Sequence, residues 1–109
     1  MATVYKVLGQ SAPSATTDTT LYTVPSATST VVSTITVCNR SAVDVTYRIA
    51  IRPAGASIAN QHYIAYDAVV QASDGILLTI GLTLATTDVV TVYASTSNLT
   101  FNLFGSEVS

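Results

Sequence analysis

Apolar and polar residues alternate along about eight short stretches of this chain, and almost none of the polar residues is charged. Residues 44–52 give one example, in which alternate positions are apolar: Val45, Tyr47, Ile49 and Ile51. Residues 76–84 repeat the pattern with Ile76, Leu78, Ile80, Leu82 and Leu84. Successive side chains of a β-strand point to opposite faces, so a period of two indicates strands that are buried on one face only. The chain is therefore expected to fold from strands.

Turn residues between the alternating stretches complete the fold prediction. Strands are expected over residues 3–9, 21–24, 29–38, 44–52, 62–66, 76–84, 89–94 and 99–104. Gly81 is expected to allow a bend, and residues 105–109 are expected to form a tail. Short strands at regular spacing are typical of sandwiches, so we predict a single antiparallel β-sandwich domain of about eight strands over residues 1–109. Jelly-roll and immunoglobulin-like connectivities both remain open, and no helix is expected.

The small number of charges indicates a surface that is covered in the working protein. Charged residues make up 9% of the chain, against about 25% in a typical globular protein. Hydrophobic residues make up 49%, which argues against disorder and makes a free monomer prone to association. With four basic residues and a net charge of −2, the chain lacks the positive charge that nucleic-acid binding needs.

No membrane-spanning or export segment is expected. The N-terminal residues do not join a basic segment to an apolar run as a signal peptide does, and no apolar run approaches the length of a transmembrane helix. Cys38 is the only cysteine, so no intrachain disulfide can form and synthesis in the cytoplasm is permitted. The glycosylation sequons at Asn39 and Asn98 are therefore interpreted as accidents of a composition rich in Asn, Ser and Thr.

The residue types that catalysis and metal binding need are isolated from one another. His62 is the only histidine, and no Gly-x-Ser-x-Gly motif presents a nucleophilic serine, so a hydrogen-bonded structural histidine is favoured. Cys38 is expected to be a small strand residue. The acids are scattered singly, and Asp74 and Asp88 suit turns. We predict a protein that is not an enzyme and has no catalytic residue, no cofactor and no metal site.

Six tyrosines raise the question of a sugar-binding platform. Tyr63 and Tyr66 are three positions apart, which in a regular strand places their rings on opposite faces. Tyr47 belongs to an apolar face and is expected in the core. The sequence therefore disfavours an exposed aromatic platform.

A few residues are candidates for contacts with other subunits. Arg48 and Arg52 share the polar face of residues 44–52, where they are either solvated charges or partners for carboxylates of a neighbouring subunit. The other candidates are hydrophobic residues at otherwise polar edges: Val69, Val70 and Phe104.

Several segments, read in order, resemble a family of small virion structural proteins of tailed bacteriophages. These segments are Lys6–Gln10, Leu21–Pro25, Val37–Arg40, Arg52–Gly55, Leu82–Leu84, Asp88–Ala94 and Phe101–Glu107. They span essentially the whole chain and consist of strand and turn patterns, not catalytic signatures. The resemblance implies a β-rich part of the virion and assigns no functional residue.

The resemblance and the composition together predict a capsid cement (decoration) protein that bridges and stabilises neighbouring major capsid subunits. Such a protein is made in the host bacterial cytoplasm, resides in the virion and binds the major capsid protein or other virion proteins. Neither nucleic acid nor membrane is an expected partner. A homotrimer is expected, because closed cyclic symmetry covers surface and matches positions where three capsid subunits meet. The alternative is a tail, neck or fibre component that contacts the host surface.

Overall fold

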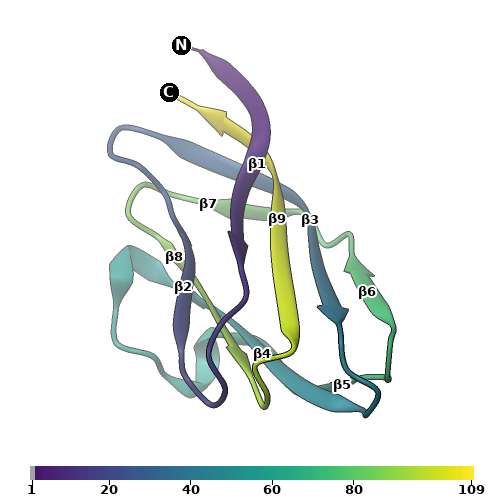
Figure 1. Cartoon of the computed structure of the whole chain (residues 1–109). Helices are drawn as coiled ribbons and strands as arrows, with labels where there is room; N and C mark the ends of the chain where they lie inside the picture. The colour runs from purple at the N-terminus through teal and green to yellow at the C-terminus, as the bar shows by residue number, and fades with distance from the viewer. Residues whose placement is uncertain (1) are drawn as a thin grey trace.

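Two antiparallel β-sheets pack face to face in the computed structural model, which describes residues 2–109. The strands are β1 (Thr3–Ser11), β2 (Thr19–Thr23), β3 (Ser29–Asn39), β4 (Val45–Arg52), β5 (Tyr63–Val70), β6 (Gly75–Leu78), β7 (Leu82–Leu84), β8 (Val89–Ala94) and β9 (Leu99–Val108). One sheet has the order β1-β9-β3-β6, with β7 also paired to β3, and the other has the order β2-β8-β4-β5. In Figure 1, β1, β9 and β3 lie nearer the viewer than β4. The predicted antiparallel β-sandwich is confirmed.

The strand pairings are nested like those of one long hairpin that has been rolled up. β1 pairs with β9, β2 with β8, β3 with both β6 and β7, and β4 with β5. Rolling also brings β9 beside β3 and β8 beside β4. This nested order is that of a jelly roll, not that of an immunoglobulin-like sandwich. The structure therefore selects one of the two connectivities that the sequence left open.

The expected strand over residues 76–84 is divided into β6 and β7. Both segments pair with β3, and residues 79–81 between them leave the ladder. Gly81 has a φ of 57° there, a left-handed conformation that glycine adopts without steric cost. The predicted bend at Gly81 is confirmed, and it raises the strand count above the predicted one. Two short 3-10 turns, η1 (Pro53–Gly55) and η2 (Asn60–His62), are the only helical elements in residues 2–109.

The prediction that residues 105–109 form a tail is wrong. β9 continues to Val108 and pairs with β1 on one side and β3 on the other. Beyond it, Ala2 and Ser109 exchange backbone hydrogen bonds of 2.8 and 2.9 Å. Gly105 explains the error, because a Cβ at this position would overlap the carbonyl oxygen of Val31. Glycine is needed here for close strand contact, although its neighbours have the composition of a loop.

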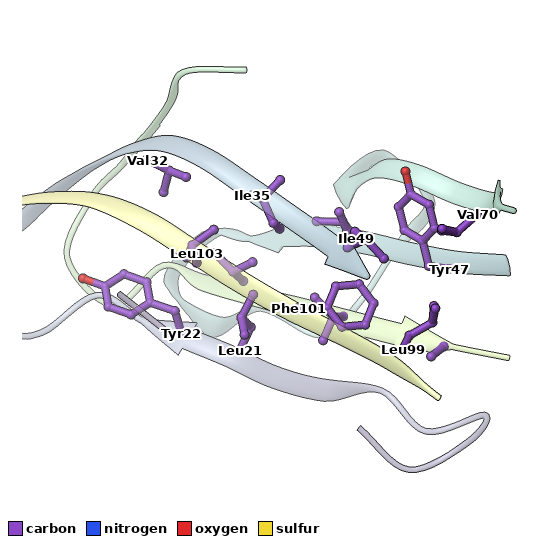
Figure 2. Packing of buried hydrophobic residues seen from close by; sticks show 14 of the residues in the cluster. Leu21, Tyr22, Val32, Ile35, Tyr47, Ile49, Val70, Leu99, Phe101 and Leu103 are labelled. Carbon is purple, nitrogen blue, oxygen red and sulfur yellow. The ribbon is translucent and has the colours of Figure 1, made fainter. Parts of the chain in front are cut away.

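The core lies between the sheets. Its largest fully buried side chains include Phe101 and Leu103 of β9, Ile35 of β3 and Ile49 of β4, which point into the space between the layers in Figure 2. The ring of Tyr47 meets that of Phe101 edge to face, with centroids 6.3 Å apart, so the predicted core position of Tyr47 is confirmed. Burial of each Leu, Ile or Phe side chain contributes about 1.5–3 kcal/mol to the free energy of unfolding, relative to leaving it exposed.

The Asn39 side chain hydrogen-bonds the segment after β3 and the end of β5 at one end of the sandwich. Its side-chain nitrogen lies 2.8, 3.2 and 3.1 Å from the carbonyl oxygens of Val43, Val70 and Gln71. Its Oδ1 accepts from the backbone N–H of Ser41 at 2.9 Å and from the Ser41 hydroxyl at 2.7 Å. Because this amide is 2% exposed and fully hydrogen-bonded, a glycan cannot be attached to it in the folded chain. The sequon at Asn39 is structural.

Candidate functional site

The histidine and the cysteine that sequence reasoning considered for chemistry stand apart from any cluster. Nδ1 of His62 accepts a hydrogen bond of 3.1 Å from the backbone N–H of Ala59, which confirms the structural interpretation of this histidine. Cys38 is an exposed thiol on β3. Within residues 2–109, no group of three or more His, Cys, Asp or Glu side chains is placed to hold a metal ion. No helix in the same residues is long and apolar enough to cross a membrane.

The aspartates predicted to lie in turns bind backbone amides there. The two carboxylate oxygens of Asp88 accept from the N–H groups of Ala54 and Ala85, each at 2.9 Å. Oδ1 of Asp74 accepts from the N–H of Gly75 at 2.8 Å. Both carboxylates therefore stabilise connections between strands by accepting from backbone N–H groups.

Arg52 uses its donors within its own chain. Its Nε donates to the carbonyl oxygen of Ala56 at 2.7 Å, and one terminal nitrogen donates to that of Gly55 at 3.0 Å. The other terminal nitrogen donates to Oγ1 of Thr91 at 3.3 Å. The guanidinium therefore secures η1 and the residues after it against β8.

Arg48 stacks against two tyrosine rings on the outer face of its sheet. The guanidinium carbon lies 4.3 Å from the ring centroids of both Tyr66 and Tyr93. Its Nε donates to Oδ1 of Asp67 at 2.7 Å, and this hydrogen bond raises the pKa of Arg48. Cation–π contact and ion pairing together hold the ring of Tyr66 in a fixed orientation.

Tyr63 and Tyr66 lie on the same face of β5, so their predicted placement on opposite faces is wrong. Their ring centroids are 4.9 Å apart and the ring planes meet at 85°. The register against β4 shifts between the Ala50–Tyr63 pair and the Ile49–Ala65 pair, where β5 has one residue more than β4. An extra residue in a strand moves every following side chain to the other face. This bulge brings the two rings together.

A shallow hollow of about 390 Å³ opens beside these two rings and is lined by Asn60, Tyr63 and Tyr66. We call these three residues the tyrosine corner; the name describes this site only and does not refer to the tyrosine-corner motif of Greek-key sandwiches. Tyr66 is 57% exposed although Arg48 covers part of its ring. A second hollow of about 420 Å³ lies along β1 and β9, where the side chains of Gln10 and Asn102 hydrogen-bond each other at 2.8 Å.

A second exposed surface lies where β1, β9 and β3 extend toward the chain termini (Figure 1). The cross-strand row Tyr5–Ser106–Val31 lies next to the pair Val7–Phe104 on the outer face. Tyr5 is 83% exposed, Val7 49% and Val31 44%, and Phe104 is partly exposed. We call Tyr5, Val7, Val31 and Phe104 the terminal patch. Sequence reasoning named only Phe104 of these four residues, although Tyr5 and Val7 alternate with Lys6 at the start of β1 and so share one face of that strand.

A polar cluster fastens the opposite face of the same strands. Glu107 of β9 accepts from Nζ of Lys6 at 2.8 Å and from the phenol of Tyr22 at 2.5 Å. These two hydrogen bonds hold the pKa of the Glu107 carboxyl below its usual range. The Tyr22 oxygen also lies 2.8 Å from Oγ1 of Thr30. The strands that carry the terminal patch are thus fixed to β2 of the other sheet.

The structure separates the two valines predicted as contacts. Val69 is 56% exposed on the outer face of β5, so its position remains compatible with a contact. Val70 is 0% exposed and belongs to the core. The prediction of Val70 as a surface contact is wrong, because adjacent strand residues face opposite sides and Val70 pairs with the buried Val45.

No protein-family model, curated protein or solved structure matches this chain. A functional interpretation therefore depends on the jelly-roll fold, the terminal patch and the tyrosine corner.

Proposed function

We propose that this protein is a non-enzymatic structural component of a bacteriophage virion, specifically a cement protein that bridges neighbouring major capsid subunits. The terminal patch is the observation that carries the proposal. Its three most exposed members are apolar or aromatic side chains that gain from leaving water. Contiguous exposed apolar surface marks contact sites, and tyrosine is enriched among the residues that dominate binding energy.

The rigid support of the terminal patch favours binding. Glu107 links Lys6 on the edge strand to Tyr22 on the other sheet, and Ala2 pairs with Ser109 at the ends of β1 and β9. A preordered surface loses little conformational freedom when a partner covers it. Such a surface is suited to adding buried area between subunits, which stabilises an assembly by mass action.

The composition and the fold support the same proposal. Charged residues make up 9% of the chain. Such a surface favours association, so it suits a protein whose surface is covered by other subunits in the particle. Jelly rolls recur in viral capsid and lectin domains; this is an argument by analogy, since a fold alone does not define a function. A homotrimer at positions where three capsid subunits meet would give each copy one subunit to contact.

Particle composition tests the proposal. Capsids stripped of their tails should retain the protein in many copies per shell, and shells lacking it should disassemble at lower temperature. If the protein instead leaves with the tail in a few copies per virion, the cement role is overturned.

The second candidate is a tail, neck or fibre component that contacts the host surface. The tyrosine corner favours it, because an exposed ring (Tyr66) paired with a partly exposed one (Tyr63) beside an amide suits recognition of an external ligand. The same fractionation of particles separates the two candidates.

A further inference from the structure

We propose that the tyrosine corner binds a neutral saccharide, with one pyranose ring seated in the hollow formed by Asn60, Tyr63 and Tyr66. This inference goes beyond the virion role and does not depend on where in a particle the protein resides. It follows from the shape, the polarity and the rigidity of the corner.

The rings of Tyr63 and Tyr66 contact each other edge to face. Their planes meet at 85° with centroids 4.9 Å apart, and the hollow beside them measures about 390 Å³. The face of an aromatic ring is electron-rich and attracts the positive edge of C–H bonds. A pyranose presents such C–H bonds on its flat faces, so it can stack on a ring face that neither the other ring nor Arg48 covers.

The polarity of the hollow suits a neutral ligand that has both apolar faces and hydroxyl groups. Its lining consists of two phenols and one amide, with no charged side chain. The nearest cation, Arg48, is stacked on Tyr66 and paired with Asp67 at 2.7 Å, so it does not offer a free site for an anion. The Asn60 amide can both donate and accept, which matches the hydroxyl groups of a sugar.

The corner is held in its binding geometry before any ligand arrives. Arg48 lies 4.3 Å from the centroid of Tyr66. A second register shift in β5, between its pairings with Tyr47 and Ile49, accompanies Asp67, whose φ is 49°. Non-glycine residues rarely adopt this conformation, and Asp is among those that tolerate it best. Bulges of this kind recur next to functional sites because they redirect side chains.

The position of the corner leaves it open when the terminal patch is covered. The corner lies on the sheet β2-β8-β4-β5, whereas the terminal patch lies on the outer face of the sheet that contains β1, β9 and β3. A hollow lined by three side chains is also much smaller than a standard protein–protein interface, which involves roughly 20–30 residues on each side.

Titration of the isotope-labelled full chain with neutral saccharides tests the proposal. The probes are glucose, galactose and maltose in one arm and N-acetylglucosamine and its β-1,4-linked dimer in the other, so the arms distinguish hexose from N-acetylhexosamine ligands. We expect at least one probe to give saturable NMR shifts centred on residues 60–67, with a millimolar dissociation constant. Tyr66→Ala should weaken binding about tenfold or more, the loss seen when an aromatic ring that stacks on a nucleic-acid base is removed. Tyr66→Phe keeps the ring and should retain most of the affinity.

Tyr5→Ala is the matched control, because Tyr5 is an exposed tyrosine on the other sheet. It should leave saccharide binding unchanged. Absence of saturable shifts up to about 50 mM of every probe overturns the proposal, since weaker binding contributes almost nothing. Binding that survives Tyr66→Ala also overturns it. If Tyr66→Ala lowers the copy number on particles while no saccharide binds, the corner is a protein contact instead.

Discussion

The phenol of Tyr22 on β2 donates a hydrogen bond of 2.5 Å to Oε2 of Glu107 on β9, and this bond joins the two sheets. Because the Tyr22 proton points to the carboxylate, the hydroxyl of Thr30 is the donor in its 2.8 Å contact with the Tyr22 oxygen. Tyr22 is 8% exposed, so water competes little for these bonds. This side chain therefore adds a polar link between the terminal strands and β2 to the apolar packing that Leu21 of β2 makes in the core.

Replacement of Tyr22 by phenylalanine should lower the free energy of unfolding by about 1.5–3 kcal/mol, the range for a hydrogen bond to a charged group. Urea denaturation measures the difference. Tyr47→Phe is the matched control: Tyr47 is as buried as Tyr22, but burial alone raises the pKa of its phenol and it has no carboxylate partner. An equal loss in both variants would show that the Glu107 bond contributes nothing.

Alkaline pH should weaken the fold through Tyr22. Burial and the hydrogen bond to Glu107 raise the pKa of Tyr22 from 10.0 to about 12. The neutral phenol is thus favoured by folding, so its contribution is complete below pH 10 and is lost as pH rises from 10 toward 12. A shift of this size corresponds to about 2–3 kcal/mol. Denaturation at several pH values should show a steeper alkaline loss in the parent chain than in Tyr22→Phe; equal slopes would contradict the assignment.

Acid pH should weaken the fold through Glu107. Its hydrogen bonds with Lys6 and then Tyr22 lower its pKa, so its contribution is present above the usual glutamate pKa and is lost as pH falls through the lowered value. Lys6→Gln should move the pKa of Glu107 upward, as measured by NMR of the carboxyl carbon. Arg40→Gln is the control, because Arg40 donates to the carbonyl of Ser97 and not to a carboxylate. An unchanged pKa in Lys6→Gln would refute the pairing.

A side chain at Gly105 should disrupt the strands that carry the terminal patch. The Cβ of Gly105→Ala would overlap the backbone of Val31, and overpacking of this kind costs about 1–3 kcal/mol or more. Gly75→Ala is the control, since its Cβ would lie 3.7 Å from the nearest atom, the carbonyl oxygen of Val37. Thermal unfolding should show a marked loss of stability for the first variant and little change for the second.

Most of the fold could be predicted from the sequence, because a period of two reports which faces are buried. The alternation in residues 44–52 placed Tyr47 and Ile49 correctly in the core. The pattern could not choose the jelly roll, since strand order depends on long-range pairings such as β1 with β9. It also misplaced residues 105–109, where a glycine needed for close packing resembles a loop glycine.

The surface features were harder to predict, because bulges and strand pairings determine which side chains are exposed. The tyrosine corner exists only through a bulge in β5, and no residue type in Tyr63–Tyr66 marks that extra position. Val69 and Val70 are both apolar residues near a polar edge, so composition alone does not say that Val70 faces the core and Val69 the solvent. Tyr5 is exposed because it pairs with Ser106 on the outer face of the sheet, and that pairing is a tertiary property.

The terminal patch should decide attachment to the particle without affecting the fold. Tyr5 is 83% exposed, so Tyr5→Ser removes little intramolecular contact and should change the unfolding temperature by no more than about 1–2 °C, as surface substitutions do. If Tyr5 is a binding hot spot of the covered patch, the variant loses about 2 kcal/mol or more of binding free energy. Val43→Ser is the matched control, because Val43 is 61% exposed in the connection between β3 and β4. Particles grown with each variant, compared by quantitative mass spectrometry after washing, should retain Val43→Ser at normal copy number and lose most of Tyr5→Ser. Full retention of Tyr5→Ser would remove the terminal patch from the interface.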